Sequence, residues 1–250
     1  MLRLMERQRL PRIPELFLGL AAIGIAVVLT AKIAAGAIHD ARYRGDTITV
    51  TGSAHEPITS NLVRWAVTDS AVAATASEAA GTLEGDLAAT RKFLGAAGVP
   101  DVAMSLGVAS TEELVERLPK HQKRVTYRVS QTINVTTGKI DVVQRVSTRL
   151  AELIQQGVGV SADPVEYLST ELNEQKFMAL AAATTDARRR ADILVRGLGG
   201  SLGGMRSSSL GVFQITPRNS TDVSDYGIND TSTRDKQVTA VVSATFDVKQ

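Results

Sequence analysis

The chain has 250 residues, 44% of them hydrophobic and 22% charged, a composition that fits a globular protein and excludes disorder over most of its length. It has no cysteine, which excludes disulfides, thiolate zinc sites and cysteine nucleophiles. The formal net charge is +2, and residues 1–15 account for it with four arginines against two glutamates. A nucleic-acid partner requires a dense positive face, so we expect none for the neutral remainder.

Residues 16–38 are predicted to form a transmembrane anchor that follows a cytoplasmic basic segment, residues 1–15. The stretch is apolar or small except for Thr30 and Lys32, and its 23 residues would rise about 34 Å as a helix, enough to cross a hydrocarbon core of about 30 Å. Lys32 lies near the outer end, where its ammonium can reach the interface. The arginines that set the orientation are Arg3, Arg7, Arg9 and Arg12.

The positive-inside rule places the N-terminus in the cytoplasm and the rest of the chain outside the membrane, in the periplasm of a bacterial envelope. A cleaved secretory signal ending at Ala35-Gly36-Ala37 is the alternative, and both interpretations export the chain. Residues 39–46 then form a short linker to an ectodomain spanning residues 47–250, and membrane lipid is the expected partner of the anchor.

The first half of the ectodomain predicts strands around one long helix. Residues 47–52 and 63–67 alternate with a period of two and indicate the two strands of a hairpin. Apolar residues then recur every three or four positions from Ala73 to Ala97, which predicts a helix ended by Gly98 and Pro100. Residues 102–109 and 124–136 are two further strands, the second with the clearest alternation in the chain.

The second half of the ectodomain is also predicted to contain both helices and strands. Helical spacing covers residues 143–154, a strand follows at 165–172, and an alanine-rich helix covers residues 177–198. Strands at 207–215 and 238–248 complete the set. The order of strands with only three long helices predicts an α+β fold with an antiparallel or mixed sheet and helices on one face.

Four stretches resemble the SIMPL domain family, whose bacterial members include periplasmic proteins of the YggE type. They are the opening strand 48–52, the strand 127–135, the helix after it, and the helix 176–191 with its run of alanines and an Ala-Arg-x-x-Ala-like end. The chain departs from the family at Glu56-Pro57-Ile58-Thr59, where members commonly have a Pro-Asp pair. The resemblance implies an α+β domain that forms large oligomers in the bacterial envelope, with links to stress tolerance and no established enzyme activity.

Catalytic and metal motifs are missing from the sequence. The three histidines, His39, His55 and His121, are not spaced for a triad or a metal site, and no zinc-protease, serine-hydrolase or phosphate-loop motif occurs. The glycines between 197 and 204 follow a helix, so they fit a helix end and tight turn. We therefore expect a protein that is not an enzyme and uses no cofactor.

Two basic groups are candidate interaction sites, each with a plainer interpretation as a solvated surface. The first is a predicted hairpin tip that could meet anionic lipid or a cell-wall polymer, and the second could hold an anion or another subunit. Their residues are Arg117, Lys120, Lys123 and Arg124 in the first, and Arg188, Arg189 and Arg190 in the second. The polar loop 216–236 is a further candidate for partner docking.

The function expected from the sequence is a membrane-anchored, self-associating structural protein. The alternative is a binding module for a lipid, cell-wall or signalling partner, using either the 117–124 patch or the 216–236 loop.

Overall fold

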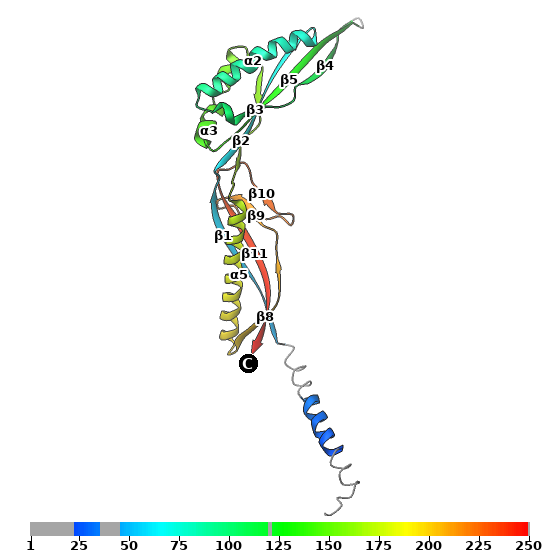
Figure 1. The fold of residues 1–250 in the computed structure, drawn as a ribbon, viewed down its shortest axis with the longest axis vertical. Coiled ribbons are helices and arrows are strands. Elements are labelled where there is room, and N and C mark those ends of the chain that lie inside the picture. The colour runs from blue at the N-terminus through cyan, green and yellow to red at the C-terminus, as the bar shows by residue number, and fades with distance from the viewer. Residues whose placement is uncertain (1–22, 36–45, 120–121, 250) are drawn as a thin grey trace, which may run out of the picture.

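The computed structural model describes residues 23–35, 46–119 and 122–249, and they form an α+β structure with two separate sheets. Figure 1 shows the sheets one after the other along the longest axis of the molecule.

The first sheet is built around the C-terminal strand β11 (Asp235–Lys249). Along one side, β1 (Thr47–Thr59) pairs with β11 over its full length, antiparallel. Along the other side, β8 (Ser201–Leu210) and β9 (Gln214–Pro217) pair with successive parts of β11, and β10 (Ile228–Asn229) adds to β9 in parallel. Inward residues of β11 alternate as the sequence predicts, from Val238 to Phe246.

Helix α5 (Leu172–Gly197) packs on this sheet through a stripe of small side chains. One residue in every four is buried, and the stripe reads Ala179, Ala183, Ala187, Ala191 and Val195. The helix backbone approaches β1 so closely that a Cβ at Gly52 would overlap the backbone of Ala183 and Ala187. The alanines and this glycine therefore set how near the helix lies to the sheet.

The second sheet has the order β3-β5-β2-β6, with β4 added to β5 and β7 added to β2. Its long strands are β2 (Leu62–Ala73), β4 (Ser110–Arg117) and β5 (Lys123–Thr137), and its short ones are β3 (Met104–Leu106), β6 (Val160–Ala162) and β7 (Glu166–Leu168). Helices α2 (Ala76–Ala96), α3 (Ile140–Ser147) and α4 (Ala151–Gln155) cover one face around the buried Trp65, and the short 3-10 helix η1 (Asp101–Ala103) leads into β3.

The predicted hairpin of the first two strands is wrong. The chain leaves β1 at Thr59 and enters β2 at Leu62, yet β1 pairs with β11 while β2 pairs with β5. Alternation predicts each strand but does not identify its partner. The paired residues of β1 and β11 are distant in the sequence, as Thr47 with Asp247 and Thr59 with Asp235 show. Residues 60 and 61 thus carry the chain from one sheet to the other (Figure 1).

Other elements differ in their bounds. The single helix expected at 143–154 is two short helices, and strand β4, whose residues are almost all exposed, has no counterpart among the predicted elements. The strand expected at 207–215 divides into β8 and β9. Because β8 begins at Ser201, Gly203 and Gly204 belong to a strand and not to a turn.

Residues 23–35 are helical and exposed, and they are the part of the expected anchor 16–38 that the structure describes. Among the described residues, no helix combines the length and apolar character needed to span a membrane. Arg3, Arg7, Arg9 and Arg12 lie outside the described residues, so the anchor and its orientation stay predictions.

Gly52 provides a test of the close approach of α5. Replacing Gly52 with Ala should lower the free energy of unfolding by about 2 to 4 kcal/mol, because a methyl group must displace the helix backbone. Gly204→Ala in β8 is the matched control, since no atom lies within 4 Å of the position that its methyl group would take. Urea unfolding followed by circular dichroism measures both, and equal stability of the two variants would contradict this packing.

Candidate functional site

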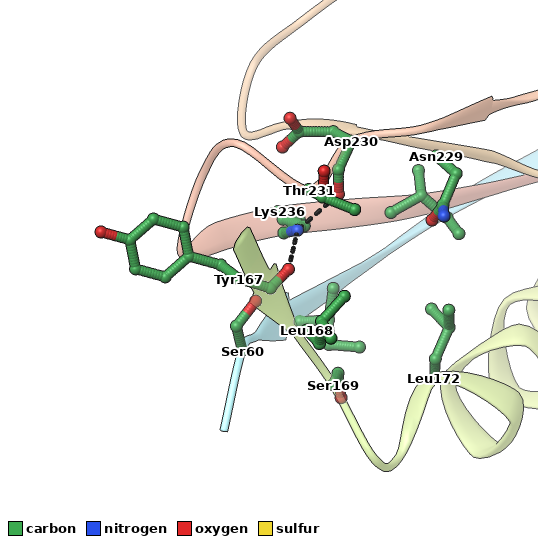
Figure 2. Close-up of a pocket in the computed structure, with 11 residues that line it drawn as sticks. Ser60, Tyr167, Leu168, Ser169, Leu172, Asn229, Asp230, Thr231 and Lys236 are labelled. Carbon is green, nitrogen blue, oxygen red and sulfur yellow. Dashed lines mark hydrogen bonds between the residues drawn. The ribbon is translucent and has the colours of Figure 1, made fainter. Parts of the chain in front are cut away.

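The junction of the two sheets holds a buried lysine beside a small cavity. Lys236, at the start of β11, is 4% exposed, and its Nζ donates hydrogen bonds to the carbonyl oxygens of Asp230 and of Tyr167, the latter at 2.7 Å. Figure 2 shows these two bonds converging on the ammonium from the loop before β11 and from β7. The adjoining cavity is about 80 Å³, and the Ser60 hydroxyl beside it has no hydrogen-bond partner among the described residues.

Burial and neighbouring groups act in opposite directions on the pKa values of Lys236 and Asp230 at this junction. Burial lowers the pKa of Lys236, while the nearby Asp230 charge acts in the opposite direction. Burial alone would raise the pKa of Asp230, but hydrogen bonds from Ser232 and Thr233, together with the Lys236 charge, leave that pKa below its usual value. Because carbonyl oxygens of Tyr167 and Asp230 both accept hydrogen bonds from its ammonium, Lys236 ties β7 of the second sheet to the first sheet.

A second buried ionisable group lies in the second sheet. Asp69 on β2 is fully buried and accepts a hydrogen bond of 2.8 Å from Thr90 of α2. Burial raises its pKa to about 6, the Thr90 bond acts against this, and the Asp86 charge adds to it. A perturbed carboxyl is a general-acid candidate. However, this side chain is enclosed between strand and helix, so a substrate has no direct contact with it.

An apolar depression lies between α5 and β8. This α5–β8 groove has a volume of about 610 Å³ and its floor is β11. Its walls and floor are mainly apolar, with hydroxyl groups and Arg188 at the sides. The lining residues used below are Leu180, Thr184 and Arg188 of α5, Met205 and Leu210 of β8, and Phe246 of β11.

The three consecutive arginines of α5 point in different directions and do not form one site. Arg190 binds Asp186 at 2.7 Å on the side of β1, Arg188 lines the groove on the side of β8, and Arg189 is exposed. Asp186 also accepts a hydrogen bond from the Ser53 amide, and this bond together with Arg190 lowers its pKa. Arg188 makes no ion pair within the described residues.

The other basic group lies on a projecting hairpin, β4 and β5, at the far end of the second sheet (Figure 1). Arg117 and Lys123 stand directly opposite each other, and Arg124 binds Glu116 at 3.5 Å. Lys120 lies outside the described residues. The prediction of a basic hairpin tip therefore matches the positions of Arg117, Lys123 and Arg124, although one of the three charges is already paired.

The loop 216–236 folds back onto the first sheet. Gln214 and Gln237 donate to the carbonyl oxygens of Ser224 and Ser220, and β10 adds to β9. Across residues 23–35, 46–119 and 122–249, no three His, Cys, Asp or Glu side chains gather as a metal site would require.

Sequence reasoning did not single out Lys236, although a signal was present. Lys236 continues the alternation of Val238, Ala240 and Val242 by one step, which places it on the buried face of β11. The first part of β8, residues 201–206, had no comparable signal, because it contains two glycines and glycine is depleted in strands.

Comparison with known families confirms the resemblance noted in the sequence. The model of the SIMPL family, described as "Protein of unknown function (DUF541)", matches residues 48–246, which is nearly all of both sheets. A search of curated proteins found no match.

Lys236→Met tests the role of the buried ammonium. We expect the free energy of unfolding to fall by about 1 to 3 kcal/mol, because two buried carbonyl groups lose their donor. The exposed Lys249→Met on the same strand is the control and should change little. Urea unfolding at pH 7 measures both, and a Lys236 variant as stable as the control would show that the junction does not depend on this group.

The raised pKa of Asp69 predicts a stability contribution that is present at low pH. The folded state holds the proton more tightly than the unfolded state, so this contribution is complete below about pH 4 and is lost as pH rises through about 6. Asp69→Asn should therefore gain stability relative to the wild type between pH 4.5 and 7.5, by about 1 to 3 kcal/mol. Denaturation at both pH values, with Asp225→Asn as control, measures this gain, and a difference independent of pH would refute the assignment.

Proposed function

Because the chain belongs to the SIMPL family, whose function is unknown, we propose a function from its own surfaces: a non-catalytic, membrane-anchored envelope protein that assembles into a large ring or cage. In this proposal the N-terminal helix holds the chain in the bacterial cytoplasmic membrane and the two sheets stand in the periplasm. Its role is structural, and the family resemblance links it to tolerance of envelope stress.

The observation that carries the proposal is the exposed apolar surface around α5. The helix buries its alanine stripe but leaves larger side chains in solvent, and the α5–β8 groove lies open beside it. Monomeric proteins rarely expose contiguous apolar surface of this kind. The exposed side chains are Phe177, Met178, Ile193 and Leu194 on α5, Leu198 directly after it, and Met205 and Leu210 on β8.

The N-terminal end of β1 and the β4–β5 hairpin lie at opposite ends of the molecule, which suits an anchored scaffold. β1 begins at Thr47, the end of the first sheet farthest from the junction, and the preceding N-terminal segment joins there. The β4–β5 hairpin lies at the opposite end (Figure 1). β1 and β5 have lengths of about 40 and 50 Å at 3.3 Å per residue. An anchor at the N-terminus would therefore hold the hairpin far from its own membrane.

This separation favours one form of the alternative function. A binding module that uses the 117–124 patch would reach a partner on a distant surface, such as an anionic cell-wall polymer, and not the lipid around its own anchor. The two proposals predict different masses for the purified protein. A scaffold assembles from many copies without any partner, whereas a binding module needs only one copy of the chain.

Light scattering of the full-length protein in mild detergent tests the proposal, with intact-chain mass spectrometry on the same sample. We expect a closed oligomer of uncleaved chains at micromolar concentration. A monomer at that concentration would contradict the scaffold and favour the binding module. A processed chain that still assembles would contradict the anchor alone.

A further inference from the structure

The first sheet ends in two strand edges that are unpaired among the described residues. β11 lies between them: residues 47–52 of β1 pair with 242–247 on one side, and β8 pairs with 242–249 on the other. The two free edges therefore lie at the same level along the sheet. Each offers a row of backbone donors and acceptors to another strand.

The remaining half of β1 is closed to such pairing. Pro57 has no amide hydrogen, and the amide of Ser53 is occupied by Asp186 of α5 at 3.0 Å. Ser53 and Pro57 have the same parity in the strand, so both belong to the row that faces away from β11. Natural sheets block edges in this way. Residues 47–52 are left as the open part of β1, at the level of β8.

The two sides of α5 above these edges also differ. The row that contains Asp186 faces β1, and it includes Met178 and Leu194, which are 48% and 51% exposed. The row on the other side, Leu180, Thr184 and Arg188, lines the α5–β8 groove. One side thus presents apolar side chains beside the Asp186–Arg190 ion pair, and the other presents an apolar groove.

We propose that the partner of the α5–β8 groove is a second copy of this chain, whose residues 47–52 pair with β8 and so continue the first sheet from copy to copy. The apolar row of the second copy's α5 then enters the groove and packs beside Met205 and Leu210 of β8. This inference rests on the proposed self-assembly and identifies its contact.

The spacing of the elements fits this contact. Neighbouring copies of α5 would be separated by three strands, about 14 Å, against 8 to 10 Å for helices in direct contact. The extra space is filled by Met205 and Leu210, which rise from β8 between the two helices and are now largely exposed.

The geometry also determines what kind of assembly results. The two surfaces differ, so the contact is head-to-tail and produces a ring if the rotation between copies closes. β1 and β8 run in the same direction within a copy, because both are antiparallel to β11. Copies placed at the same level therefore point the same way, and all N-terminal segments leave from one side of the ring.

An added charge tests the contact in the full-length protein in mild detergent. Leu194→Glu would bury a carboxylate in the apolar groove of the next copy, so the concentration needed for assembly should rise at least tenfold. Ile193→Glu is the matched control, because this neighbouring residue is similarly exposed and belongs to another row of α5, and it should assemble like the wild type. Circular dichroism and urea unfolding confirm that both variants fold.

Crosslinking gives a second measurement, because the chain has no cysteine of its own. Thr49 and Ser207 both pair with Thr245 from opposite sides, so within one copy they are about 10 Å apart, too far for a disulfide. Thr49→Cys combined with Ser207→Cys should give a ladder of linked chains on oxidation. The pair His55→Cys and Ser207→Cys, on the closed half of β1, should not.

The outcomes separate this inference from the proposed function. A wild-type monomer would overturn both. An assembly of the wild-type protein that persists in Leu194→Glu, together with no ladder from the cysteine pair, would place the contact elsewhere. That result would overturn the inference and leave the scaffold intact.

Discussion

The close contact of α5 with β1 is the constraint on which the first sheet depends. Alanines at every fourth position bring the helix onto the strands, and Gly52 lets two backbones meet where a side chain would separate them. The contact covers β1 and β11 but leaves β8 largely uncovered, which creates the apolar groove. The small residues let α5 pack closely on β1 and β11. A helix that lies so close to two strands does not extend over the third strand, β8, so the surface of β8 stays open.

The division into two sheets separates two kinds of surface. The first sheet has apolar surface and open edges near the end where the N-terminal segment joins, whereas the second carries a projecting hairpin with charged residues at the other end. Residues 60 and 61 and the hydrogen bonds of Lys236 connect them. If copies associate through the first sheet as proposed, the hairpin of the second sheet stays accessible to a partner.

The buried side chains of Lys236 and Asp69 form hydrogen bonds that connect elements of the fold. Lys236 is held by carbonyl groups from both sheets, and Asp69 is enclosed between β2 and α2 with a hydrogen bond from Thr90. Neither is arranged to transfer a proton to a bound molecule. Their perturbed pKa values follow from burial, and a perturbed value has functional meaning only where a substrate can reach the group.

The sequence alone determined the α+β class, the family, most strands and the long helices, because alternation and helical spacing are local properties of the chain. It also separated Arg117 and Lys123 from the arginines of α5. Strand partners were decided only by the tertiary structure, since β1 and β11 are distant in sequence and alternation does not identify a neighbour. The same holds for the groove, the blocked half of β1 and the separate directions of Arg188 and Arg190, which exist only once α5 lies on the sheet.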